Sequence, residues 1–230
     1  YRDRYLKDYL SHLQIFHFHD TSMSSRLRKA CDVEDNAYLK PDGGNLAAYL
    51  YYLKQQHRPI FNRIEHTVKR VAPFLDHFLL EPSRINDGKI ELRWNEAEDL
   101  ESNFGPSQFS DGTLRFIALT TLLLQPEPPE IIIIDEPELG LHPQAITLLA
   151  SMMHSLSEAD KSQLIVSTQS VDLVDHFQAE DIIAVDRSAG QKQSIFHRLD
   201  SSLLQSWLQD QSLGDLWERS VIDTGQPVKK

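Results

Sequence analysis

Four consecutive isoleucines, Ile131 to Ile134, constrain the fold of this chain more than any other stretch. An apolar run of β-branched residues without polar alternation is typical of a strand buried on both faces, as in a parallel sheet. The run ends at Asp135 and Glu136, and open α/β sheets bind ligands at the carboxyl ends of their strands. Asp135 is therefore a candidate for holding Mg²⁺, and Glu136 for orienting a water molecule that attacks a phosphate. A core strand followed by a solvated acidic turn stays open as the alternative.

Further apolar segments follow at the spacing of a doubly wound fold. Pro143 opens a helix, residues 162–168 form a second predicted buried strand, and residues 181–185 form a third. The alternation of strands and helices predicts an α/β fold with a parallel sheet and right-handed crossovers. Residues 194–199 are predicted to add an edge strand, and residues 203–208 a helix whose region includes the packing residues Trp207 and Trp217.

A polar turn, Phe109–Thr113, leads into the apolar helical segment RFIALTTLLL. The first N–H groups of a helix, with the hydroxyl of Ser110 and the small Gly112, can form a phosphate site. Ser-x-Gly before a helix is also a common N-cap, so a purely structural role for Ser110 stays open.

The N-terminal half is predicted to be a mixed subdomain, residues 1–95, appended to a core of residues 96–230. Its predicted elements are a helix over 2–13, a strand over 14–18, a helix from the N-cap Asn45 to about residue 56, a helix from Pro59 to about residue 73, and a strand in KIELRW.

His17, His19 and Asp20 form a cluster of metal-ligating residue types after the first predicted strand. Imidazoles two residues apart on a strand share a face and could hold a metal. A metal site needs three or four ligands, however, so a structural role for these residues is favoured.

Composition excludes several classes of protein. The 230 residues carry a net charge of −11, which argues against non-specific polyanion binding by the fold as a whole. The single cysteine, Cys31, suits a reducing cytoplasm, and no apolar run approaches the ~20 residues of a membrane helix. Two basic clusters, residues 26–29 and Lys69 with Arg70, are interpreted as solvated helix faces.

Three motifs stand in order: FSDGT at 109–113, IIIIDEPELGLHP at 131–143 and STQS at 167–170. Their order and spacing resemble the ABC-type ATPases of the RecF-like, SMC-like and OLD-like branch. The nearest resemblance is to bacterial AAA-family ATPases whose C-terminal halves carry SDGTLR, a Walker B strand and a Gly-Leu-His-Pro turn. The resemblance implies a P-loop NTPase-like core, with ATP and Mg²⁺ as ligands.

The resemblance also implies a role for each matching residue. Ser110, Asp111, Gly112 and Thr113 match the signature loop, which in that family contacts the γ-phosphate bound to the opposite protomer. Asp135 matches the Mg²⁺-associated Walker B acid, and Glu136 the residue that polarises the attacking water. The turn ending at His142 matches a dimer contact that borders the nucleotide.

Two departures from the family pattern stand out. Gln169 occupies the usual place of a switch histidine, and glutamine can bond a phosphate or water but cannot become cationic. No G-x-x-x-x-G-K-[ST] motif occurs in the 230 residues. The expectation is that this sequence is the C-terminal half of a longer ATPase, inactive without an upstream Walker A half.

The resemblance implies a homodimeric ATPase that couples hydrolysis to DNA repair or anti-phage defence, with DNA or a protein as a further partner and no membrane. The alternative is a nucleotide-gated clamp with little or no hydrolysis, in which ATP binding drives dimerisation. Catalysis in the first case is assigned to Glu136 and Gln169.

Overall fold

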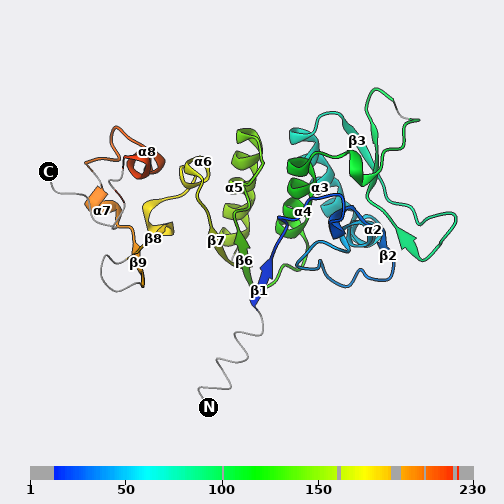
Figure 1. Cartoon of the computed structure of the whole chain (residues 1–230), viewed down its shortest axis with the longest axis horizontal. Helices are drawn as coiled ribbons and strands as arrows, with labels where there is room; N and C mark the ends of the chain where they lie inside the picture. The colour runs from blue at the N-terminus through cyan, green and yellow to red at the C-terminus, as the bar shows by residue number, and fades with distance from the viewer. Residues whose placement is uncertain are drawn as a thin grey trace, which may run out of the picture. The chain divides into compact units, whose positions relative to one another are not determined.

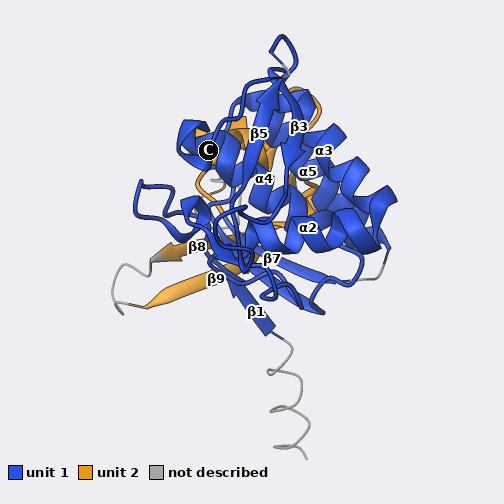
Figure 2. Ribbon diagram, turned by 90° about the vertical axis from the view of Figure 1, so that its right-hand side faces the viewer, with its two compact units in different colours: residues 1–167 blue, residues 168–230 orange. Residues whose placement is uncertain are grey.

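The computed structural model describes residues 13–99, 101–159, 162–187, 193–204, 206–219 and 222. The chain forms two compact units, residues 1–167 and 168–230, coloured separately in Figure 2. The helix predicted over residues 2–13 lies outside the described residues except for Leu13, which begins a strand. The subdomain boundary predicted near residue 95 falls inside the first unit and stays a prediction.

The first unit contains a parallel sheet, whose strands lie side by side in Figure 1. It contains β1 (Leu13–Phe16), β6 (Ile131–Asp135) and β7 (Gln163–Ser167) in the order β1-β6-β7. The predicted α/β fold with a parallel sheet is confirmed, and the isoleucine run is its central strand. Residues 13–16, predicted to belong to a separate subdomain, pair with residues 131–134 in this sheet.

The described part of the first unit has four helices, which Figure 2 shows on one side of β1 and β7. They are α2 (Leu46–Gln56), α3 (Arg58–Val71), α4 (Asp111–Leu124) and α5 (Pro143–Glu158). Every residue of α4 from Leu114 to Leu123 is buried, as expected for a helix in the middle of its layer. Pro59 and Pro143 lie in the first turns of α3 and α5, where the missing N–H costs no helical hydrogen bond.

The two faces of the sheet differ in burial. Phe16, Ile132 and Ile134 are buried on the face that the helices cover. On the other face Ile15, Ile133 and Ile165 are in register, and Ile15 and Ile165 are 43% and 47% exposed. The prediction that residues 162–168 form a fully buried strand is therefore wrong, because within the described residues β7 is an edge strand with one face uncovered.

Two short antiparallel pairs complete the first unit. β2 (Cys31–Asp32) pairs with β4 (Lys89–Ile90), and β3 (Leu75–Leu79) pairs with β5 (Arg93–Glu96). The single strand predicted in KIELRW is therefore two strands with different partners. Two 3₁₀ turns, η1 (Arg26–Arg28) and η2 (Pro106–Gln108), precede segments that approach the site described below.

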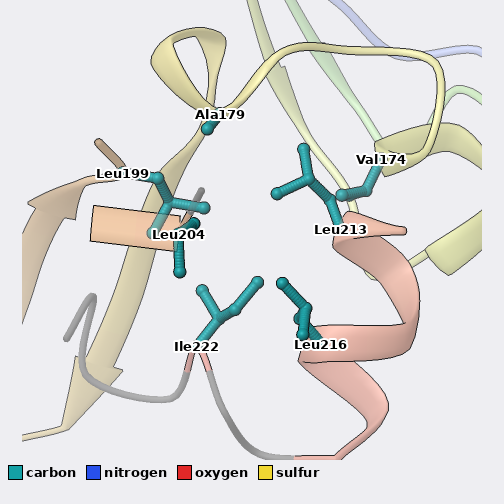
Figure 3. Packing of buried hydrophobic residues seen from close by; sticks show 7 residues of the cluster. All are labelled: Val174, Ala179, Leu199, Leu204, Leu213, Leu216 and Ile222. Carbon is teal, nitrogen blue, oxygen red and sulfur yellow. The ribbon is translucent and has the colours of Figure 1, made fainter. Parts of the chain in front are cut away.

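The second unit has its own apolar core, shown in Figure 3. Its elements are α6 (Val171–Val174), η3 (Ala179–Asp181), β8 (Ile183–Arg187), β9 (Ser194–Arg198), α7 (Ser201–Leu204) and α8 (Leu213–Glu218). β8 pairs antiparallel with β9 and not with the parallel sheet, so the prediction that it is a third parallel strand is wrong. The helix predicted over 203–208 overlaps α7 only at residues 203 and 204, since 206–208 form a turn, whereas Trp207 and Trp217 pack against the core as predicted.

No helix among the described residues is long and apolar enough to cross a membrane.

Candidate functional site

The central strand β6 delivers Asp135 to the carboxyl edge of the sheet. Ile131, Ile132 and Ile134 are at most 4% exposed, whereas Asp135 is exposed. Ser167 lies opposite Asp135 in the register with β7, and its hydroxyl donates a hydrogen bond to the Asp135 carboxylate. The predicted placement of this acid at a strand end is therefore correct.

Glu136 begins the turn that leaves the sheet. Its φ is 37°, in the left-handed region, and its N–H donates to the Ser167 carbonyl at 2.8 Å. On the other side of the same peptide bond, the Asp135 carbonyl oxygen lies 2.7 Å from Nε2 of His19. Glu136 is half-buried, and it is the only non-glycine residue with positive φ in the described part of the chain.

The turn from Leu139 to His142 connects the acids to α5. Gly140 has φ 77°, a conformation that glycine adopts without strain. His142 is exposed and is the N-cap of α5, with Nδ1 accepting from the N–H of Gln144 at 3.4 Å. Its predicted contacts with nucleotide or a second copy stay predictions.

The signature turn, Ser110 to Thr113, begins α4. The Ser110 hydroxyl accepts from the N–H of Thr113 at 3.1 Å, so its N-cap role is present. Ser110 and Asp111 are exposed, and Gly112 and Thr113 are half-buried. This cap does not rule out phosphate binding by Ser110, because a capping hydroxyl can accept from a backbone N–H and still donate its own proton. Phosphate binding at the signature turn stays a prediction.

Gly112 brings the signature turn against the turn that follows β6. A Cβ atom placed on Gly112 would lie 2.3 Å from the Gly140 carbonyl oxygen, closer than any real contact. Two of the three sequence motifs are therefore in direct backbone contact. Their spacing in sequence gave no indication of this contact.

Two buried arginines tie the segment after β1 to the signature turn. Arg28 donates to Asp111 Oδ1 at 2.7 Å and to the carbonyls of Thr21 at 2.7 Å and Phe109 at 3.1 Å. The interpretation of residues 26–29 as a solvated basic face is thus wrong for Arg28, whose side chain is 5% exposed. A buried guanidinium needs this set of acceptors because an uncompensated charge would be costly to bury.

Arg115, one turn into α4, holds the same segment from the other side. It donates to the carbonyls of Phe18 and His19, each at 3.0 Å. Burial lowers the pKa of Arg115, and the nearby charges of Asp111 and Glu138 oppose that shift. The sequence held one signal for this contact, the arginine near the start of an otherwise apolar helix. Buried arginines are rare unless they are paired, so a buried Arg115 needs partners.

The His17, His19 and Asp20 cluster does not gather around a metal. β1 ends at Phe16, so the histidines do not share a strand face. Asp20 accepts from the hydroxyl and N–H of Ser22, and these bonds lower the pKa of Asp20. Across the described ranges no group of three or more His, Cys, Asp or Glu side chains could hold a metal.

Gln169, the remaining predicted catalytic residue, is exposed and belongs to the second unit, two residues after β7 ends. The part it plays beside Glu136 stays a prediction. Within the first unit the donor set at the sheet edge suits Mg²⁺, which binds carboxylate and hydroxyl oxygens with several waters. Asp135 and Ser167 supply oxygens of both kinds.

Comparison with known proteins places the chain in a family. The sequence model of a family described as "AAA domain, putative AbiEii toxin, Type IV TA system" matches residues 16–175. The chain belongs to this AAA domain family. The motifs on which the resemblance was based, from Ser110 to Gln169, all lie inside the matched region of the AAA domain.

A curated archaeal protein is similar in sequence to part of this AAA domain. A "Putative ABC transporter ATP-binding protein" of Methanothermobacter thermautotrophicus is 28% identical over 125 residues, 51% of this chain and 44% of that protein. The chain therefore spans less than half the length of that relative.

Two solved SMC ATPase structures are similar to this chain to different degrees. A crystal structure of an SMC head bound to the C-winged helix domain of ScpA matches with a TM-score of 0.54 and 17% identity, covering 82% of this chain and 56% of that one. A structure from work on ATP-driven dimerization and DNA stimulated activation of SMC ATPases matches with a TM-score of 0.47 and 16% identity, covering 70% and 96%. The first of these matches shows that the AAA domain has the P-loop NTPase-like α/β fold of an SMC head.

Proposed function

We propose that this AAA domain binds ATP with Mg²⁺ between two copies of the protein and hydrolyses it. The observation that carries the proposal is the position of Asp135 and Glu136 at the carboxyl end of the central strand, where open α/β sheets bind ligands. The signature turn lies beside this edge through the contact of Gly112 with Gly140.

Each residue of the site has a part in the proposed reaction. Asp135, with Ser167 bonded to its carboxylate, would hold Mg²⁺ through its oxygens, directly or through water. A bound Mg²⁺ would neutralise charge on the β- and γ-phosphates. Glu136 would orient the attacking water and accept its proton, and the signature turn would contact the γ-phosphate held by the other copy.

The β- and γ-phosphates also need a cradle of backbone N–H groups and a lysine. No such motif occurs in these 230 residues, and the archaeal relative is more than twice the length that the match covers. We propose that residues outside this sequence supply the phosphate loop, so that this sequence alone does not turn over ATP.

The decisive experiment uses the full-length protein that contains this sequence. We expect Glu136→Gln to lower the ATP turnover number by at least about 100-fold, because the amide cannot accept the proton of the attacking water. The control is Glu127→Gln, an equal change of charge at an exposed residue just before the strand. Equal turnover in the Glu136 variant and the unchanged protein would remove Glu136 from the mechanism.

Gln169 favours a second candidate, a nucleotide-gated clamp that dimerises on ATP and hydrolyses it slowly or not at all. Sedimentation of the full-length protein with and without ATP and Mg²⁺ separates the two candidates when combined with the turnover measurement. A mass that doubles with ATP, with turnover insensitive to Glu136→Gln, would favour the clamp. A molecular mass that is the same with and without ATP would contradict ATP-driven dimerisation in both candidates.

DNA repair or anti-phage defence is the process in which we propose that the ATPase acts, with DNA or a protein as its partner. Support comes from the resemblance to RecF-like and OLD-like ATPases. The same turnover assay with and without double-stranded DNA tests the partner, since a DNA-coupled ATPase changes its rate when DNA is added.

A further inference from the structure

The peptide bond between Asp135 and Glu136 is held at both of its polar atoms. Its carbonyl oxygen lies 2.7 Å from His19 Nε2, and its N–H donates to the Ser167 carbonyl at 2.8 Å. A carbonyl has no proton to give, so Nε2 is the donor in the first of these bonds. Because a peptide unit is planar, two bonds on opposite sides restrain its orientation and with it the backbone from which both acidic side chains project.

This restraint matters because of the backbone conformation of Glu136. A φ of 37° is unfavourable for a residue with a Cβ atom, and such conformations persist only where the surroundings hold them. The bond from Ser167 belongs to the continuing β6–β7 ladder, which is present whatever side chain occupies position 19. The bond from His19 is a side-chain contact from a segment 116 residues away.

His19 is itself held in place by the signature helix. Arg115 of α4 donates to the carbonyls of Phe18 and His19, and Phe18 is 2% exposed. The neighbouring His17 is exposed, and its backbone N–H donates to the Pro41 carbonyl at 2.8 Å. A continuous set of contacts therefore runs from the first turn of α4 through Arg115 and His19 to the peptide between the two acids.

We infer that His19 is a positioning residue for Glu136, holding the Asp135–Glu136 peptide in the orientation that aims the proposed catalytic carboxylate, and that it links this peptide to the helix of the signature turn. The inference rests on the proposed function for the role of Glu136 in hydrolysis. The hydrogen bond on which it depends can be tested separately from any activity.

The test compares His19→Leu with His19→Gln in the full-length protein. Leucine fills a similar volume but has no donor, whereas the glutamine side-chain amide can bring an N–H to the place of Nε2. We expect His19→Leu to lower kcat for ATP by about 10- to 100-fold with KM for ATP within about twofold, because a misplaced catalytic group costs rate more than binding. His19→Gln should recover most of kcat, and His17→Leu is the control that changes neither constant.

Hydrogen exchange supplies a readout that needs no turnover. In His19→Leu the peptide segment covering residues 131–141 should exchange faster than in the unchanged protein, His19→Gln or His17→Leu, because the pinned peptide is freed. If Glu136→Gln does not affect turnover, the proposed function fails, and exchange alone then decides whether His19 holds the peptide. Unchanged exchange in His19→Leu would overturn the inference. If Glu136→Gln lowers turnover, an unchanged kcat in His19→Leu would overturn it too. So would a kcat in His19→Gln as low as that in His19→Leu.

Discussion

At the scale of single residues, the site depends on a glycine with no side chain and on buried arginines that donate to backbone carbonyls. Gly112 is small because the Gly140 carbonyl occupies the place of a side chain. Arg28 and Arg115 are buried, and each donates to at least two backbone carbonyls. Substitution at either kind of position is costly for a reason that can be stated in advance, a steric clash at the glycine and unsatisfied acceptors at the arginines.

Gly112→Ala tests the contact between the two turns. A Cβ atom 2.3 Å from a backbone oxygen cannot be relieved by a side-chain rotation, so the turns must separate. We expect a loss of about 1–3 kcal/mol in the free energy of unfolding, measured by chemical denaturation. Gly105→Ala is the matched control, since a Cβ there meets nothing within 4 Å. Equal stability of the two variants would show that the turns do not touch.

At the scale of elements, a short segment joins parts of the first unit that are distant in sequence. Arg28 in η1 donates to the Phe109 carbonyl, which follows η2, and pairs with Asp111 in α4.

The start of α2 shows a similar link between loop segments. Asn45 is the N-cap as predicted, but its side chain makes no cap bond. It accepts from the Lys40 N–H and donates to two loop carbonyls. Polar side chains here shape loops around the helix starts.

Arg28→Ala should destabilise the first unit strongly. The change leaves the Asp111 carboxylate and several carbonyls without their donor, and breaking a buried pair typically costs about 3–5 kcal/mol. Because Asp111 is exposed and can be solvated, we expect the lower end of that range in chemical denaturation.

Arg26→Ala, two residues earlier, is the matched control. Arg26 pairs with Asp42 on the surface with its side chain 75% exposed, and such pairs contribute at most about 1 kcal/mol. A comparable loss in both variants would indicate that burial of Arg28 contributes nothing.

At the scale of the whole molecule, the two units have separate apolar cores. The seven buried residues of the second core all lie between Val174 and Ile222 (Figure 3). Because all members of this cluster come from the second unit, we expect a core defect there to be felt mainly in that unit.

Leu216→Ala tests this separation. Leu216 is fully buried, and truncation of such a residue costs about 2–5 kcal/mol. We expect faster hydrogen exchange across residues 168–219 of the full-length protein and unchanged exchange in β6. Phe116→Ala, at a fully buried position of α4, should give the reverse pattern. Loss of protection in both units from either change would contradict independent cores.

The sequence by itself determined the features that depend on neighbouring residues. The apolar run of β6 and its acidic end, the prolines that begin α3 and α5, and the caps Asn45 and Ser110 are all local patterns. Local patterns are readable because strand and helix periodicity and capping act over a few residues. Asp135 at the sheet edge followed from them, and so did the parallel α/β fold.

Only the tertiary structure decided which distant residues meet. It placed β1 beside β6, paired β8 with β9, buried the side chain of Arg28 against the signature turn and set the His19 ring against the Asp135 carbonyl. Apart from the β8–β9 pair, these contacts join residues far apart in the chain, as in the 116 positions between His19 and Asp135 and the 83 between Arg28 and Asp111. No local propensity encodes such a pairing, because it depends on how the whole chain is packed and on which polar groups must be satisfied once they are buried.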